Sequence, residues 1–269
     1  MNPPVWEKAF NQSCKILYHN IQSLKDKIQD IRADLLLPFS DLIILGETWL
    51  ETDEDNEDSL SALCQNIKKE NNINVSTLHL NDYELHLNGN GRGKGLATYF
   101  KEKKFAVKQD ITNEDLQITI LESENLCVIG LYRSTGDRTL SLHLKELIPA
   151  AGNCLIIGDF NICTRRSPSH EVFLTLKQLG FKLLVSEATH FDGGYLDQAW
   201  LRIMKSTQHV HTVELYSPYY NCKDHDALLF SFYDPSTEQG RVYPTILHSY
   251  IELVAMKEHP YICTSKYIG

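Results

Sequence analysis

The sequence predicts a single α/β domain of two packed β-sheets with helices on their outer faces. Many short apolar runs are bounded by Gly, Asn, Asp or Pro, which is typical of strands, and segments of helical period stand between them. Neither a repeat nor a long linker divides the 269 residues, and 42% of them are hydrophobic, enough for one large core. We expect the domain to span 12–234, followed by an extension over 235–269 for which no motif indicates a role.

The first elements are a short strand over 15–18, a helix and a second strand over 41–45. The helix has Ser23 as a candidate N-terminal cap and ends before Pro38, because proline cannot continue a helix. Its apolar residues recur at spacings of four, three and four: Leu24, Ile28, Ile31 and Leu35.

The middle of the chain predicts a helix carrying Leu60, Leu63, Cys64 and Ile67, and then a series of strands. The Gly-rich segment 88–95 lacks a G-x-x-x-x-G-K-[ST] string and precedes a strand rather than a helix, so we interpret it as a hairpin and not a phosphate-binding loop. The strands are expected at 75–80, 83–87, 96–100, 105–108, 116–122 and 126–132.

In the second half, helices are expected at about 139–148 and 169–179, on either side of a buried strand over 154–157. Four further strands complete the two sheets: 181–185, 197–203, 209–215 and 227–232.

Polar residues follow several of these strands. Asp159 and Asn161 come directly after the apolar run 154–157, and side chains two residues apart on a strand point to the same side. Glu47, Asp197 and the segment Asp224-His225-Asp226 occupy similar strand ends. Mg²⁺ prefers a few carboxylates together with water and phosphate oxygens, so this pattern favours metal-assisted phosphoester hydrolysis. No G-x-S-x-G turn is present that would favour acyl hydrolysis.

Composition limits the partners and the compartment. The net charge of −9 argues against unspecific coating of nucleic acid, and the acidic run 51–58 is interpreted as a solvated loop. Seven cysteines without a C-x-x-C pair suit a reducing compartment. No signal peptide or membrane span is evident, so we expect an intracellular protein that contacts no membrane, nuclear rather than cytoplasmic.

Seven motifs, in this order, resemble those of the endonuclease/exonuclease/phosphatase superfamily. Within it they are most similar to the apurinic-type endonuclease domain of non-LTR retrotransposons and of some Helitron-type transposons. The motifs are Tyr18-His19-Asn20, Gly46-Glu47-Thr48-Trp49-Leu50, Gly93-Lys94-Gly95-Leu96, Leu131-Tyr132-Arg133, Gly158-Asp159-Phe160-Asn161, Leu196-Asp197 and Asp224-His225.

The resemblance implies a four-layer α/β sandwich of two mixed β-sheets flanked by helices, Mg²⁺ (or Mn²⁺ in its place) as cofactor, and DNA as substrate. For the metal it implies Glu47 as ligand, Asn20 as a residue that positions the site, and Asp224 as a ligand or a contact to the metal's water. For catalysis it implies Tyr132, Asp159, Asn161, and His225 aligned by Asp197. Either Asp159 or His225 would be the general base.

The basic residues leave alternatives open. Arg133, next to Tyr132, is a candidate DNA contact or a member of a surface salt bridge. Arg165, Arg166 and the lysines Lys101, Lys103 and Lys104 are candidate contacts to the DNA backbone or ordinary solvated charges. Three functions follow: a Mg²⁺-dependent endonuclease that nicks DNA, a phosphatase acting on a small or lipid phosphoester, and a nucleic-acid-binding or scaffold module without turnover.

Overall fold

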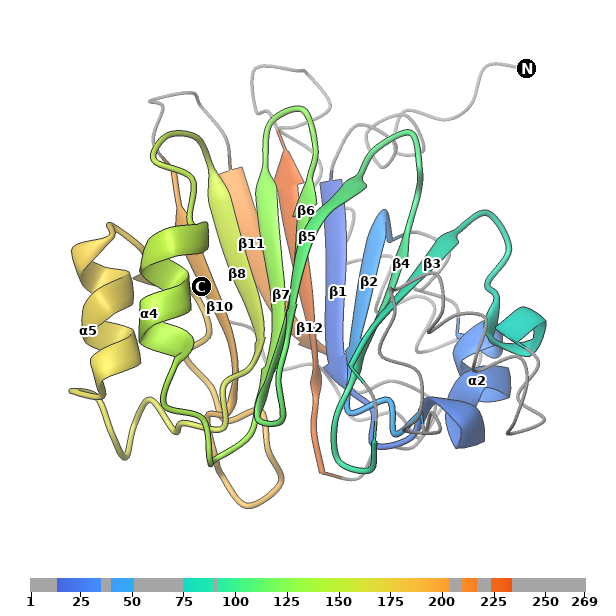
Figure 1. Ribbon diagram of the computed structural model, residues 1–269, viewed down its shortest axis with the longest axis horizontal. Helices are drawn as coiled ribbons and strands as arrows, with labels where there is room; N and C mark the ends of the chain where they lie inside the picture. Colours follow the sequence, from blue (N-terminus) through green and yellow to red (C-terminus); the bar gives the residue numbers. More distant parts are fainter. Residues whose placement is uncertain are drawn as a thin grey trace.

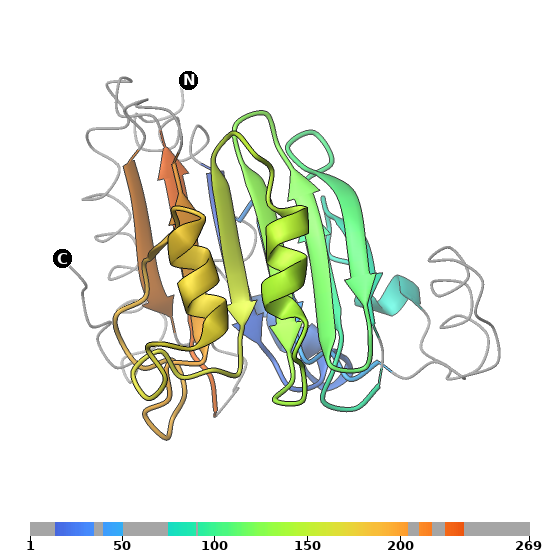
Figure 2. The same ribbon diagram turned by 60° about the vertical axis from the view of Figure 1, so that its left-hand side comes forward.

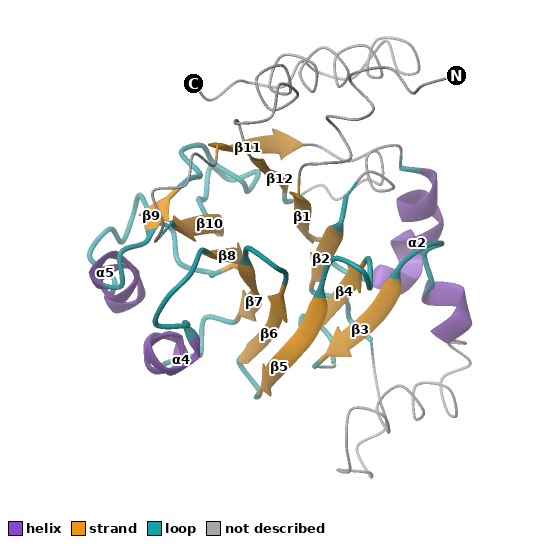
Figure 3. Cartoon of the chain, turned by 90° about the horizontal axis from the view of Figure 1, so that it is seen from above, coloured by secondary structure: helices purple, strands orange, loops and turns teal. Residues whose placement is uncertain are grey.

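The computed structural model describes residues 14–34, 40–50, 75–89, 91–203, 210–216 and 224–233. Two six-stranded sheets face one another, and helices lie on their outer faces (Figures 1 and 3). The layers therefore run helix, sheet, sheet, helix, which confirms the predicted four-layer α/β sandwich.

The first sheet has the strand order β11-β12-β1-β2-β4-β3. Its central strands β1 and β2 are parallel, with Asn20 opposite Gly46, and all its other pairings are antiparallel. Its strands are β1 (Cys14–Asn20), β2 (Leu42–Gly46), β3 (Glu84–Asn88), β4 (Leu96–Phe100), β11 (Val210–Tyr216) and β12 (Ala227–Tyr233).

The second sheet has the order β5-β6-β7-β8-β10-β9, and in it only the pair β7–β8 is parallel. Its strands are β5 (Ala106–Thr112), β6 (Leu116–Glu122), β7 (Cys127–Arg133), β8 (Cys154–Asp159), β9 (Lys182–Leu183) and β10 (Asp197–Arg202). The parallel pair in each sheet places two strand ends at the same edge of that sheet, which is where the polar motifs occur.

Helix α2 (Leu24–Ala33) covers the first sheet, and α4 (Leu140–Leu147) and α5 (Glu171–Gln178) cover the second (Figures 2 and 3). A central apolar layer fills the space between the sheets, and a further cluster lies under the helices on each side. The sheets approach closely at Gly130, where a Cβ atom would lie 2.8 Å from Cδ1 of Ile44. No helix among the described residues is long and apolar enough to cross a membrane.

Two local predictions are wrong. The run 75–80 forms the 3₁₀ helix η2 (Val75–Leu78) instead of a strand. Ser23 stands at the first position before α2, but its hydroxyl donates to Oδ2 of Asp26 at 2.6 Å and does not cap the backbone, because Ser23 adopts a φ of 89°. The segment 88–95 joins the antiparallel strands β3 and β4, so the hairpin is confirmed. The expected helix at 60–67, the acidic run 51–58 and the extension 235–269 lie outside the described residues.

Candidate active site

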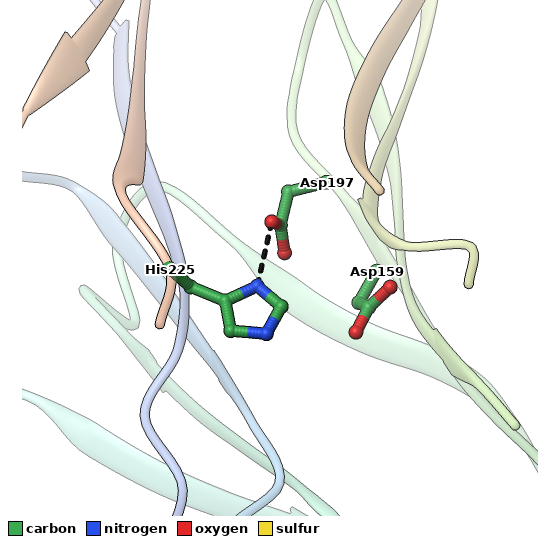
Figure 4. A group of neighbouring side chains, drawn as sticks. All are labelled: Asp159, Asp197 and His225. Carbon is green, nitrogen blue, oxygen red and sulfur yellow. Dashed lines mark hydrogen bonds and ion pairs between the residues drawn. The ribbon is translucent and has the colours of Figure 1, made fainter. Parts of the chain in front are cut away.

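His225 and Asp197 form a buried pair. Asp197 is the first residue of β10, and His225 precedes β12 by two positions. The imidazole Nδ1 donates to Oδ2 of Asp197 at 2.8 Å, and the two side chains are 5% and 0% exposed (Figure 4). Burial lowers the pKa of His225, but the hydrogen bond and charge of Asp197, with the charges of Asp159 and Glu47, raise that pKa to about 9. The imidazole is therefore oriented and cationic at neutral pH.

Asp159 faces the same imidazole. It ends β8 and lies opposite Asp197 in the antiparallel pairing, so both carboxylates point toward His225 (Figure 4). One ligand atom from each of the three residues lies within 4.8 Å of the others. Burial and the charge of Asp197 raise the pKa of Asp159 to about 7, so this carboxylate binds a proton near neutral pH, as a general base requires.

Asn20 joins the two sheets at this site. Its Nδ2 donates to Oε1 of Glu47 at 2.9 Å and to Oδ2 of Asp159 at 3.0 Å. The other carboxylate oxygen of Glu47 accepts the indole N–H of Trp49 at 3.2 Å. The amide of Asn20 thus contacts Glu47, which follows a strand of the first sheet, and Asp159, which ends a strand of the second. This bridge places Glu47 beside Asp159 and His225.

Tyr132 and Asn161 complete the arrangement. Tyr132 on β7 lies beside Asp159 and hydrogen-bonds to Glu47, and its burial, together with the charge of Glu47, raises its pKa well above the ordinary value. A neutral hydroxyl is therefore available as a donor. The amide Nδ2 of Asn161 donates to the carbonyl oxygen of Arg133 at 2.8 Å, and its backbone N–H donates to Oδ1 of Asp159, also at 2.8 Å.

The loops that carry these residues contain a cluster of left-handed backbone. Five non-glycine residues here have positive φ: Gln22, Ser23, Glu47, Trp49 and Asn161. Such conformations cost about 1–3 kcal/mol each and cluster at functional sites. Backbone hydrogen bonds hold three of them: the N–H of Ser23 donates to the carbonyl oxygen of Glu47 at 2.9 Å, and that of Trp49 donates to the carbonyl oxygen of Lys94 at 3.1 Å.

Sequence reasoning missed two residues that support the site. The backbone N–H of Asp159 donates to the hydroxyl of Tyr18 at 2.9 Å, a link between β8 and β1. Gly46 leaves room for that hydroxyl, because a Cβ there would lie 2.6 Å from it. The signal was present, since a tyrosine within a buried strand needs a hydrogen-bond partner for its hydroxyl.

A third missed feature is the loop around His190. Its imidazole packs edge-on against that of His225, with ring centroids 4.7 Å apart, and its Nδ1 lies 2.7 Å from Oδ1 of Asp192. The next residue, Phe191, is 73% exposed, an unusual state for a large aromatic side chain. Its backbone N–H donates to the carbonyl oxygen of Asp224, so this loop borders the site.

The structure corrects the interpretation of Arg133. The residue is 4% exposed, its Nε donates to Oδ2 of Asp137 at 3.0 Å, and its Nη1 donates to the carbonyl oxygen of Phe160 at 3.1 Å. Burial and these bonds leave the guanidinium out of reach of DNA. Arg133 forms a buried ion pair rather than a DNA contact or a surface salt bridge.

The lysines after β4 are also far from the site. Lys101 and Lys104 pair with Asp41, which precedes β2, whereas Glu47 follows the opposite end of that strand. Arg165 and Arg166 are exposed in the segment after Asn161. Their contact to DNA, and a metal-binding role for the partly buried carboxylate of Asp224, remain predictions.

The donor set suits a hard divalent cation. Three carboxylates, those of Glu47, Asp159 and Asp197, gather around one imidazolium, so the site carries an excess of negative charge. Oδ1 of Asp197 is buried and has no hydrogen-bond partner among the described residues. Oxygen donors of this kind match the preference of Mg²⁺ and Mn²⁺, and soft thiolate ligands are absent from the group.

Comparison with solved structures supports the fold. A 3′ phosphatase, NExo from Neisseria, bound to a product DNA hairpin, aligns with a TM-score of 0.57 and 17% identity over 81% of this chain and 99% of that one. The endonuclease domain of TRAS1, a telomere-specific non-LTR retrotransposon, aligns with a TM-score of 0.54 and 12% identity over 82% and 98%. An AP endonuclease from Archaeoglobus fulgidus gives 0.53 and 15% over 81% and 98%.

Among curated proteins no match is found. The family model of the endonuclease/exonuclease/phosphatase family, however, matches residues 17–236, which include every residue of the site described above. This protein therefore belongs to the endonuclease/exonuclease/phosphatase family.

Proposed function

We propose that this phosphodiesterase of the endonuclease/exonuclease/phosphatase family nicks DNA and leaves 3′-OH and 5′-phosphate ends, as an endonuclease of retrotransposon type. The observation that carries the proposal is the meeting of Asp159 and the His225–Asp197 pair with the Asn20–Glu47 bridge from the other sheet. A DNA substrate also favours a nuclear location over a cytoplasmic one.

The side chains divide the work of hydrolysis. Asp159, with its pKa near 7, orients a water molecule and accepts its proton as the oxygen attacks phosphorus. The cationic imidazole of His225 and the neutral hydroxyl of Tyr132 donate to the phosphate oxygens, where negative charge grows in the transition state. The amide of Asn161 would donate to the same water or to a phosphate oxygen. Asp197 holds the imidazole in one tautomer.

The metal would be held by Glu47, with Asn20 fixing the position of that carboxylate and Asp224 as a further ligand. When bound, Mg²⁺ or Mn²⁺ supplies a positive charge that stabilises the phosphate and the departing 3′ oxygen.

Nicking of supercoiled plasmid tests the proposal. Purified protein with MgCl₂ should convert supercoiled plasmid to the open-circular form, and Asp159→Ala and His225→Ala should each abolish that conversion. Lys108→Gln, at an exposed position far from the site, is the matched control and should retain activity. Extension of the nick by a DNA polymerase without prior phosphatase treatment would establish the 3′-OH end.

A phosphatase activity is the second candidate, since one of the structural relatives is described as a 3′ phosphatase. Release of phosphate from a 3′-phosphorylated oligonucleotide or a lipid headgroup, without plasmid nicking, would favour it. Binding of DNA that is equal in wild type, Asp159→Ala and His225→Ala, without cleavage of any substrate, would instead identify a binding or scaffold module.

A further inference from the structure

The Gly-rich hairpin packs along the loop that carries Glu47. The backbone N–H of Trp49 donates to the carbonyl oxygen of Lys94 at 3.1 Å, and that of Gly91 donates to the carbonyl oxygen of Leu50 at 2.8 Å. These two bonds fasten the tip of the hairpin to the segment just after Glu47. The hairpin is therefore part of the rim of the site.

Arg92 extends this rim with a positive charge. Its guanidinium lies over the indole of Trp49, 5.7 Å from the ring centroid, and the N–H of that indole donates to Oε2 of Glu47 at 3.2 Å. Arg92 is exposed, and in the part of the chain that the structure describes it forms no ion pair with a carboxylate. Among the described residues, this arginine beside an acidic centre thus has an aromatic support and no carboxylate partner.

We infer that Arg92, supported by Trp49, binds a phosphate of the DNA backbone next to the one that is cleaved. A guanidinium stacked on an aromatic ring can still donate two hydrogen bonds to a phosphate through its N–H edge. Stacking also restricts the conformations of the arginine side chain before the phosphate binds. The inference rests on the proposed function and narrows it, because a site with a second phosphate contact selects a polynucleotide over a small phosphomonoester.

The glycines on either side of Arg92 agree with this role. Gly91 and Gly93 have φ of +99° and +73°, and a Cβ atom at either position would meet no atom within 4 Å. Packing against the described residues therefore does not require glycine there. Glycine lets the backbone take these conformations and keeps side chains out of the space through which a strand would approach Arg92.

The salt dependence of DNA binding separates a phosphate contact from a structural role. Equilibrium binding of a fluorescent 16-base-pair duplex would be measured by anisotropy in EDTA at several NaCl concentrations. Each phosphate contact contributes about 0.9 to the slope of log K against log[salt]. Arg92→Gln should lower that slope by about 1 and weaken binding about tenfold near 0.1 M salt. Lys108→Gln, which removes the same charge far from the site, should leave the slope unchanged.

Two further variants sharpen the result. Arg92→Lys should keep the slope but bind more weakly than wild type, because an ammonium cannot stack or make the two-pronged contact. Trp49→Phe removes the indole N–H and keeps an aromatic face, so it should slow nicking and leave the salt slope unchanged. An Arg92→Gln slope equal to that of wild type would overturn the inference.

The binding assay needs no cleavage, so it tests the phosphate contact independently of the proposed nicking activity. If the salt slope is lower in Arg92→Gln and wild type does not nick plasmid, the phosphate contact is retained and the nuclease is rejected. Nicking by wild type together with an unchanged salt slope in Arg92→Gln would retain the nuclease and reject the phosphate contact. Absence of any duplex binding by wild type would reject the phosphate contact, and the plasmid assay would still decide the proposed function.

Discussion

Replacement of Asp197 by asparagine should change both the charge and the activity of His225. The structure attributes the high pKa of His225, about 9 against an ordinary 6.5, chiefly to the hydrogen bond and charge of Asp197 acting against burial. A rise of this size is worth about 3 kcal/mol in favour of the cation, at about 1.4 kcal/mol per pKa unit. Without the carboxylate we expect the pKa of His225 to fall to about 6.5 or below.

The kinetic consequence can be calculated. At pH 7.5 roughly 97% of the imidazole is cationic in wild type, and about 10% or less would be cationic in Asp197→Asn. Loss of the cation alone should therefore reduce the nicking rate about tenfold or more, and misorientation of the ring adds to this. Lowering the pH to 6 should reduce the wild-type rate several-fold, because Asp159, with a pKa of about 7, becomes protonated. In the variant, recovery of the His225 cation should offset that reduction, so the variant should lose less of its rate than wild type. Asp192→Asn, at an exposed carboxylate beside His190, is a matched control and should change the rate little.

Two measurements check this reasoning. Imidazole ¹⁵N chemical shifts, recorded against pH in EDTA, give the pKa of His225 directly, and single-turnover nicking gives the rate. A pKa that stays near 9 in Asp197→Asn would refute the assigned cause of the shift. A ratio of variant to wild-type rate that is the same at pH 6 and pH 7.5 would refute the cationic role of His225.

Three further predictions concern the supports of the site. Tyr18→Phe leaves the buried N–H of Asp159 without its acceptor, so chemical denaturation should show a loss of about 1–3 kcal/mol, and an unchanged midpoint would contradict the link. Burial lowers the pKa of His19 to about 4, so on acidification the unfolded chain binds a proton before the folded protein does. The free energy of unfolding should therefore fall by about 3 kcal/mol as the pH drops from 6.5 to 4. Between pH 6.5 and 4, metal-free His19→Gln should lose about 3 kcal/mol less stability than metal-free wild type. Equal losses in the two proteins would contradict the lowered pKa of His19. Gly158→Ala would drive a Cβ into the carbonyl oxygen of Leu131, so we expect a loss above about 4 kcal/mol by denaturation or failure to fold, whereas a stability near that of wild type would contradict the packing.

The sequence was most informative where local pattern and burial agree. The strand expected at 116–122 is β6 with the same bounds, because six consecutive buried positions in a strand paired on both sides leave little freedom of register. The run 75–80 has the apolar content of a strand, but its residues turn into η2, whose Leu78 packs beneath α2. Only the tertiary contact decides between these two conformations, so no local rule could have identified it.

The proximity of the proposed catalytic residues was predictable because they stand at strand ends, whereas their supporting partners were not. The order of the motifs alone predicts that Glu47, Asp159 and His225 lie close together. Arg133 shows where prediction from the motif fails. An arginine at this position can be exposed and contact DNA or be buried in an ion pair, and here the carboxylate of Asp137, four residues later, forms the ion pair. The support of Asp159 by Tyr18 crosses between the sheets, and such pairs follow from packing rather than from spacing along the chain.

The most direct test asks whether side chains from the two sheets act as one site on DNA. The measurement is the single-turnover rate of plasmid nicking in Mg²⁺ for wild type, Glu47→Gln, His225→Ala and the double variant. Residues that act as a unit give strongly non-additive losses, so each single change should lower the rate about 10³-fold or more and the double change should cost little beyond the worse single one. Losses that multiply in the double variant, or a wild type that leaves plasmid intact, would contradict the account.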